Sequence, residues 1–191
     1  ALLNLESVKL YGVLFPLKTK IADWQSQLIE LHSLVKEVIP AAQITPVVFG
    51  YPVKSTWLLL LQNSDELRPT GGFIGTYGLL QTDSGDIARC DTHDVYHLDM
   101  PVKDKLDVAP PAPLVKYLGI NKWYLRDANW SPDWPTAAKK IEWFYRAEDE
   151  LLPPKDKINN FSGEFSGVIG ITPEFITDLL KLTGPINVEN I

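Results

Sequence analysis

The chain has 191 residues, of which 45% are hydrophobic, and a formal net charge of −6 with a pI near 5.0. This length and composition suffice for one core of ordinary size. The acidic balance and the lack of a dense Lys/Arg run argue against duplex nucleic acid as a partner, because phosphate neutralisation needs clustered cations.

Cysteine and histidine usage argues against the commonest disulfide and metal frameworks. Cys90 is the only cysteine, which leaves no internal disulfide and no cysteine-based zinc site. The three histidines (His32, His93 and His97) do not form a convincing metal set. We expect no membrane span within the chain, since it has no apolar run of about 18 residues. The first residues lack the basic start and cleavage pattern of a signal peptide. Both ends read as cut, so we expect a piece of a longer protein.

The N-terminal part carries a helical pattern. Between Leu17 and Ile39, apolar residues recur every three or four positions, and Pro40 is expected to end the helix. Two interpretations are open for this helix, and they are compatible. It packs on a sheet or a neighbouring helix, and it descends as a stalk from an upstream membrane anchor. We therefore predict a helical segment over residues 1–40 and a mixed α/β domain over 41–191 that is truncated at its C-terminus. The apolar positions of the helix are Ile21, Trp24, Leu28, Leu31, Val35 and Val38.

Three strand patterns follow. Residues 56–62 form a continuous apolar run, which is typical of a strand covered on both faces. Residues 73–83 form the next strand, and the turn at 83–86 joins it to a third extended segment over 87–99.

The remaining segments alternate helices with strands. We expect a short helix that ends at Gly119, a helix with Pro135 in its first turn, and a buried strand over 165–171. A helix with Thr172 as its N-cap and a strand from Pro185 follow. This order predicts a mixed α/β fold: a three-layer α-β-α sandwich around a mixed central sheet, with an N-terminal amphipathic helix.

A charged loop at residues 63–72 (NSDELRPTGG) separates the first two strands. Pro69 restricts Arg68 to an extended conformation, and the glycine pair lets the backbone approach a bound group closely. A guanidinium group binds phosphate bidentately, and free N–H groups can complete the cradle. The alternative is a tight loop in which Arg68 pairs with Asp65 or Glu66. Both interpretations stay open.

A second polar cluster spans residues 126–135 (RDANWSPDWP). Asp127 and Asp133 could hold Mg²⁺, with Arg126 on an oxyanion. Alternatively, Ser131 or Asp133 caps the following helix, Arg126 pairs with Asp127, and the tryptophans at 123, 130 and 134 are core. We favour capping for Ser131 and Asp133, and a site role for Arg126 and Asp127.

A third cluster, Asp91 to Asp94 followed by Asp99, places His93 between carboxylates. It could serve general-base chemistry or metal binding, but a solvated strand end is the commoner arrangement. The GxSxG, Walker, CxxC and HExxH patterns are all missing, so ordinary hydrolase, NTPase and zinc-protease functions lack support.

Three long segments carry a family resemblance. Residues 58–80, 123–145 and 167–188 resemble the bacterial family catalogued as domain of unknown function 4012, and the similarity covers residues 40–191. Such proteins look like envelope proteins with an N-terminal membrane helix. The resemblance therefore implies an extracytoplasmic location, with the anchor upstream of these residues.

The chain is more distantly similar to the LytR-CpsA-Psr phosphotransferases, which move glycopolymers from polyprenyl pyrophosphate carriers onto the cell wall. Arg68 matches the turn arginine of that family, and its closing unit is matched by Phe175, Asp178, Gly184 and Val188. The family's Arg-x-Asp-Thr turn is replaced by residues 68–71 (RPTG), so its aspartate is lost.

The resemblance and the clusters together imply a polyprenyl-phosphate- or pyrophosphate-linked glycan as ligand. Two hypotheses follow: a non-catalytic envelope module that keeps an anion-binding groove, and an Mg²⁺-dependent phosphotransferase that attaches glycopolymers to the cell wall. A purely structural or interaction module is a third. The lost aspartate favours the non-catalytic module, and no catalytic residue is assigned. The expected ligand-binding residues are Arg68, Thr70, Gly71, Gly72, Arg126 and Asp127; no metal site is assigned, and Asp65, Asp91 and Asp127 are the candidates if Mg²⁺ binds.

Overall fold

A computed structural model describes residues 15–157, 161 and 163–186, and the side chains from residue 20 onward within that part. The chain divides into two compact units, Ala1–Val48 and Phe49–Ile191. The described part of the first unit is a single helix, α1 (Phe15–Val48). Among the described helices, none is long and apolar enough to cross a membrane.

Helix α1 continues past Pro40, where the sequence predicted its end, so that prediction is wrong. Proline's fixed φ is compatible with helical geometry, and its main cost inside a helix is a lost hydrogen bond and local crowding. Pro46 is likewise accommodated. The helix ends at Val48, close to Gly50, whose φ of 71° leaves the helical region. The predicted boundary between residues 40 and 41 thus falls inside α1.

The second unit is built on a four-stranded mixed sheet in the order β3-β2-β1-β4. Strands β1 (Ser55–Asn63) and β2 (Phe73–Asp83) are antiparallel neighbours, as are β2 and β3 (Asp86–Asp94). Strand β4 (Gly167–Ile171) pairs in parallel with β1. The predicted mixed α/β class is confirmed.

The hairpin turn between β2 and β3 has the expected chemistry. Ser84 and Gly85 both have positive φ, 53° and 98°, as the two-residue turns that match strand twist require. Strand β3 nevertheless ends at Asp94 rather than at 99. The Asp94 carboxylate accepts a hydrogen bond from the backbone N–H of Tyr96 at 2.8 Å, which turns the chain into α2 (Tyr96–Val102).

Two short elements lead to the main helix: α3 (Ala112–Leu118) and the 3₁₀ turn η2 (Leu125–Asp127). The main helix is α4 (Trp134–Leu151), and the 3₁₀ turn η3 (Pro154–Asp156) follows it. The predicted end of α3 at Gly119, with φ 67°, is confirmed. The last helix is α5 (Pro173–Thr183). The strand predicted from Pro185 lies largely outside the described residues.

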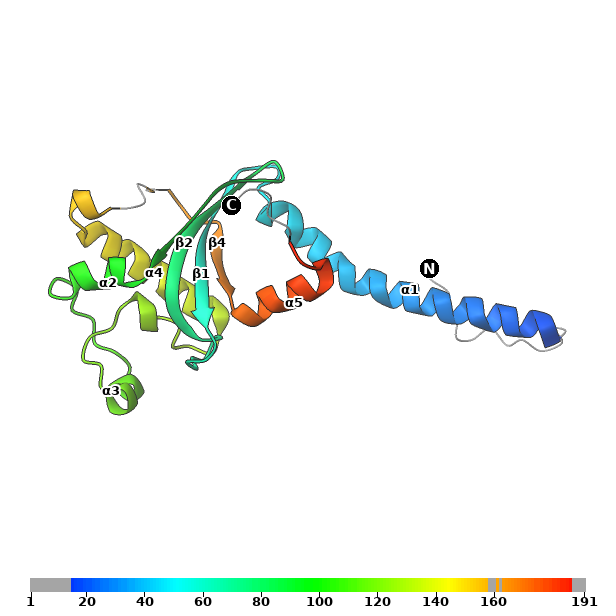
Figure 1. The fold of residues 1–191 in the computed structure, drawn as a ribbon, viewed down its shortest axis with the longest axis horizontal. Coiled ribbons are helices and arrows are strands. Elements are labelled where there is room, and N and C mark those ends of the chain that lie inside the picture. The colour runs from blue at the N-terminus through cyan, green and yellow to red at the C-terminus, as the bar shows by residue number, and fades with distance from the viewer. Residues whose placement is uncertain (1–14, 158–160, 162, 187–191) are drawn as a thin grey trace. The chain divides into compact units, whose positions relative to one another are not determined.

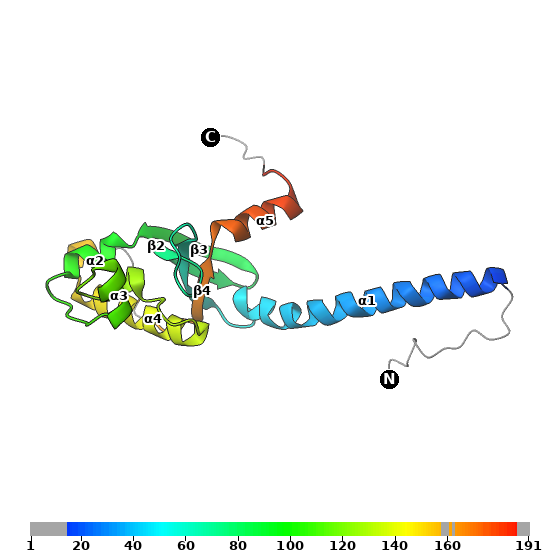
Figure 2. The same cartoon turned by 90° about the horizontal axis from the view of Figure 1, so that it is seen from below.

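Helices lie on both sides of the sheet, with α2 and α4 to one side and α5 to the other (Figures 1 and 2). The core lies on the α4 side, where the alternate β1 residues Leu58 and Leu60 belong to one buried cluster with Ile141 and Phe144 of α4. The α5 side is thinner, since no residue of α5 is buried. The sheet and α4 therefore position the β1–β2 loop and the segment that precedes α4.

Candidate functional site

The loop between β1 and β2 is shaped by its two glycines. Gly71 has a φ of 129°, a conformation that side-chain-bearing residues rarely adopt. A Cβ on Gly72 would lie 2.2 Å from the carbonyl oxygen of Asn63, so the loop closes directly onto the end of β1. The backbone N–H of Phe73 donates to the carbonyl of Glu66 at 2.9 Å. This closure fixes the place of Arg68.

Arg68 does not project into solvent. Its side chain is 7% exposed and forms ion pairs with Glu66, at 2.8 Å, and with Asp127, at 3.0 Å. Its guanidinium lies over the Phe73 ring, 5.5 Å from the centroid. Of the alternatives left open by the sequence, internal pairing describes this arginine, and the partner from the second polar cluster was not foreseen.

Arg126 is also held by carboxylates. Its Nη1 donates to Asp99 Oδ2 at 2.9 Å, and its Nε lies 3.4 Å from Asp127 Oδ2. Its guanidinium stacks near the rings of Tyr96 and Tyr124, at 5.5 and 5.3 Å. Asp127 therefore lies between two arginines and compensates both.

Glu148 of α4 extends this cluster into the core. It is fully buried, as is Asp99 apart from 1% of its surface, and Glu148 Oε1 accepts a hydrogen bond from the backbone N–H of Leu125 at 2.8 Å. Burial, followed by the negative charge of Asp99, raises the pKa of Glu148 to about 9. Glu148 therefore holds a proton at neutral pH. We refer to Arg68, Asp99, Arg126, Asp127 and Glu148 as the ion network.

The structure brings most of the predicted site residues together and separates the rest. Arg68, Arg126 and Asp127 meet in the ion network, and buried Asn129 donates from Nδ2 to the carbonyl of Gly72 at 2.7 Å. Thr70, whose hydroxyl is buried without a partner in the described part of the chain, lines a separate 470 Å³ cavity beside β4.

The candidate metal ligands do not gather. Asp65 is exposed, and Asp91 pairs with Arg89 on β3. Among the described residues, no three His, Cys, Asp or Glu side chains could hold a metal ion. His93 of the third cluster lies beside the Tyr77 ring, with centroids 5.8 Å apart.

Helix capping follows the favoured interpretation of the second cluster. Asp133 is the N-cap of α4, and its Oδ2 accepts from the backbone N–H of Thr136 at 2.9 Å. The Ser131 hydroxyl accepts from the N–H of Asp133 at 3.2 Å. Both side chains therefore hold the start of the helix.

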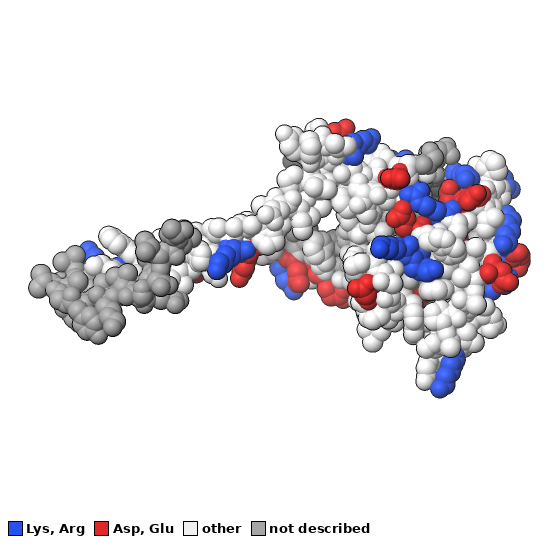
Figure 3. Space-filling view, turned by 180° about the vertical axis from the view of Figure 1, so that it is seen from behind, with Lys and Arg blue, Asp and Glu red and all other residues white. Residues whose placement is uncertain are grey.

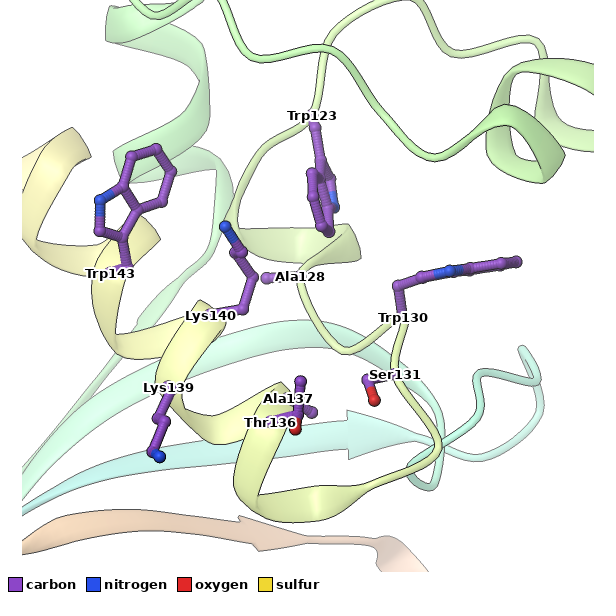
Figure 4. Close-up of a pocket in the computed structure, with 9 residues that line it drawn as sticks. All are labelled: Trp123, Ala128, Trp130, Ser131, Thr136, Ala137, Lys139, Lys140 and Trp143. Atoms are coloured by element: carbon purple, nitrogen blue, oxygen red, sulfur yellow. The ribbon is translucent and has the colours of Figure 1, made fainter.

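Beside the ion network lies an open pocket of about 500 Å³ that the sequence did not predict (Figure 4). One wall is the segment 123–131 that includes η2, and the other is formed by residues 136–143 of α4. We call it the Trp/Lys pocket. Its lining residues are Trp123, Ala128, Trp130, Ser131, Thr136, Ala137, Lys139, Lys140 and Trp143.

Lys140 lies among the aromatic rings of this pocket. Figure 4 shows its amino group between Trp123 and Trp143; Nζ is 4.7 Å from the Trp143 centroid and 5.4 Å from that of Trp123. Such contacts stabilise the ammonium without neutralising it. Trp143 is 45% exposed, so ring surface stays available to a ligand.

The helical pattern of 134–151 contained a signal for this pocket. Thr136, Lys139, Lys140 and Trp143 stand at positions i, i+3, i+4 and i+7, which lie along one side of a helix. Only the opposite, buried face entered the sequence argument, so this polar-aromatic face was missed.

An open four-stranded mixed sheet, an arginine loop whose charge is compensated by carboxylates, and an adjacent aromatic pocket thus define a small α/β domain. Comparison with known families assigns it: the family described as "Protein of unknown function (DUF4012)" matches residues 54–191, and the chain belongs to that family. No curated protein matches the chain, and no solved structure does.

Proposed function

We propose that this domain is a non-catalytic binding module of the cell envelope whose ligand is a glycan carrying phosphate, and that the ligand binds in the Trp/Lys pocket. The observation that carries the proposal is the pocket itself: three indoles and two lysines around 500 Å³ of open space. The similarity to envelope phosphotransferases noted from the sequence supports a lipid-linked glycan phosphate and an extracytoplasmic location, with membrane attachment outside these residues.

The chemistry of the pocket fits a sugar with an anionic group. A pyranose ring presents an apolar face of C–H bonds, which packs against the electron-rich face of an indole. Trp143 on α4 and Trp123 on the facing segment lie on either side of the Lys140 amino group, and the Trp130 ring extends away from them (Figure 4). The ammonium group of Lys140, between those rings, adds a point charge that suits phosphate. Lys139 also lines the pocket, with its amino group directed away from that of Lys140 (Figure 4). Apolar walls with a few convergent polar groups are the usual composition of a ligand site.

Local charge matters here because the surrounding surface is mixed. On the face drawn in Figure 3, Lys and Arg side chains are interspersed with Asp and Glu. With a net charge of −6, the domain has no general attraction for anions. An anionic ligand would therefore depend on specific lysines.

In this proposal Arg68 and Arg126, which the sequence predicted as ligand contacts, do not contact the ligand. Phosphate at Arg68 would have to displace Glu66 or Asp127, and at Arg126 it would displace Asp99 or Asp127. Removing one member of a buried ion pair leaves an uncompensated charge, which is strongly unfavourable. We therefore place the ligand at the lysines, and the phosphotransferase hypothesis stays a prediction.

Titration calorimetry with two matched probes tests the proposal: an N-acetylglucosamine tetramer and the same tetramer with a terminal phosphate. We expect Trp143→Ala to weaken both probes about tenfold or more. Lys140→Met, which keeps the aliphatic stem, should weaken only the phosphorylated one. Lys157→Met, which removes a lysine paired with Asp149 outside the pocket, is the charge control. Absence of binding by the wild-type protein, or equal affinity in Trp143→Ala, contradicts the proposal.

A further inference from the structure

The two walls of the Trp/Lys pocket differ in how they are supported. Helix α4 supplies one wall and is held by its own backbone hydrogen bonds and its buried face. The other wall, residues 123–131, contains only the single 3₁₀ turn η2. Irregular backbone of this kind keeps a fixed shape only when neighbouring groups anchor it.

Asp127 anchors that wall at two points. Its backbone carbonyl accepts a hydrogen bond from the Trp123 indole Nε1 at 2.8 Å, which sets the orientation of the ring that faces the pocket. Its carboxylate, 3% exposed, accepts from Arg68 Nη2 at 3.0 Å. A continuous chain of contacts therefore runs from the β1–β2 loop to a tryptophan of the pocket.

Two further contacts hold the same wall. Asn129, next to the pocket residues Ala128 and Trp130, donates to the Gly72 carbonyl at 2.7 Å. On the α4 side, Glu148 accepts from the Leu125 N–H at 2.8 Å. The β1–β2 loop and α4 thus each hold the wall by a hydrogen bond, which restricts its distance from α4.

We propose that Arg68 and Asp127 are positioning residues for the Trp/Lys pocket: their ion pair holds the wall bearing Trp123 and Trp130 in its binding geometry without contacting the ligand. The inference rests on the proposed function for its consequence in affinity. It also explains why an arginine is buried in a loop next to a strand, since an Arg–carboxylate pair of this kind is directional as well as strong.

The first test needs no ligand. The six tryptophans give six indole N–H signals in a ¹⁵N–¹H NMR spectrum, and Trp123 is assigned by its loss in Trp123→Phe. We expect Asp127→Asn and Arg68→Lys to shift the Trp123 signal, because each alters the anchor of its acceptor. Glu66→Gln is the matched control. Glu66 is the other partner of Arg68, and its side chain is 53% exposed. We expect this variant to leave the Trp123 signal in place.

The second test measures affinity for the phosphorylated N-acetylglucosamine tetramer. We expect Asp127→Asn and Arg68→Lys to weaken binding about tenfold, as small misplacements of positioned groups do, and Glu66→Gln to bind as wild type does. Leu79→Ala, a cavity variant in the buried core of β2, shows what loss of stability alone does; it should keep the wild-type affinity at temperatures where it is folded.

The outcomes separate the two proposals. An unmoved Trp123 signal in both Asp127→Asn and Arg68→Lys overturns the positioning role, whatever the affinities are. If Asp127→Asn does not fold, Arg68→Lys decides alone. If wild-type protein binds neither glycan probe, the proposed function fails, and the Trp123 signal still decides whether the ion pair orients the pocket wall.

Discussion

Asp99 and Glu148 are two carboxyl groups in one buried environment, and Arg126 is the cation that faces them. Burial raises the pKa of both: that of Glu148 to about 9 and that of Asp99 to about 6. The arginine cannot compensate both groups as anions, so Glu148 stays protonated. At the scale of single residues, a proton is therefore part of the folded structure.

A stability–pH profile tests this protonation. Because the pKa of Glu148 is raised on folding from 4.5 to about 9, the native state binds more protons than the unfolded state in that window. The contribution of Glu148 to stability is fully present below pH 4.5 and is lost as the pH rises toward about 9. We expect the unfolding free energy, measured with urea, to fall over this range. Glu148→Gln should flatten the profile, and an unchanged slope in this variant would show that Glu148 is ionised.

Gly72 is required by close approach rather than by φ. A Cβ at this position would lie 2.2 Å from the Asn63 carbonyl oxygen, a backbone atom that cannot move aside alone. We expect Gly72→Ala to lower the unfolding free energy by about 1–3 kcal/mol. In Gly75→Ala the new Cβ meets only the Phe73 ring at 3.8 Å, so this control should change stability by less than about 0.5 kcal/mol. Equal losses in the two variants would refute the steric explanation.

Helix α4 is the element that joins the core to the pocket. Phe144 is fully buried, while its neighbour Trp143 is 45% exposed and lines the pocket. Their rings are in edge contact, with centroids 4.8 Å apart. Adjacent residues of one helix thus face opposite environments, which follows from the 100° turn per residue.

The two faces of α4 should separate stability from binding. Phe144→Ala is expected to lower the unfolding free energy by about 3–5 kcal/mol, because it leaves a cavity in the core. Trp143→Ala should change the unfolding free energy by less than about 1 kcal/mol and yet weaken glycan binding about tenfold or more. Urea unfolding and calorimetry on the same samples measure both quantities. A large stability loss in Trp143→Ala would assign that ring to the core.

The unit Phe49–Ile191 carries its own core, since every member of the buried cluster lies between residues 58 and 152. Its first residues are tied to the β2–β3 turn: the Ser84 N–H donates to Gly50 O at 3.0 Å and the Gly85 N–H to Phe49 O at 2.9 Å. This unit therefore has the means to fold by itself.

Expression of residues 49–191 without α1 tests that independence. We expect this shorter chain to unfold cooperatively, with a melting temperature within a few degrees of the 191-residue chain, because α1 contributes no described residue to the core. Calorimetry or circular dichroism measures it. A non-cooperative transition in the shorter chain would mean that α1 completes the fold.

The sequence by itself determined the elements whose signals are local. The apolar run 56–62, the positive-φ turn at Ser84 and Gly85, the cap at Asp133 and the class of the fold follow from period, turn chemistry and caps, which act over a few residues. It misjudged Pro40 and the end of β3 because those outcomes depend on a tolerated proline and one side-chain hydrogen bond.

Only the tertiary structure decided what the arginines do. Arg68 meets Asp127 across 59 positions of sequence, and Lys140 meets Trp123 because α4 folds back beside η2. Charged and aromatic residues are visible in a sequence, but their partners depend on how distant segments pack. Arg68 looked like an anion-binding residue, and its ion pair with Asp127 at 3.0 Å makes it a structural contact instead. The lysines of α4 that line the pocket, rather than the arginines paired with carboxylates, are therefore where a ligand should be sought.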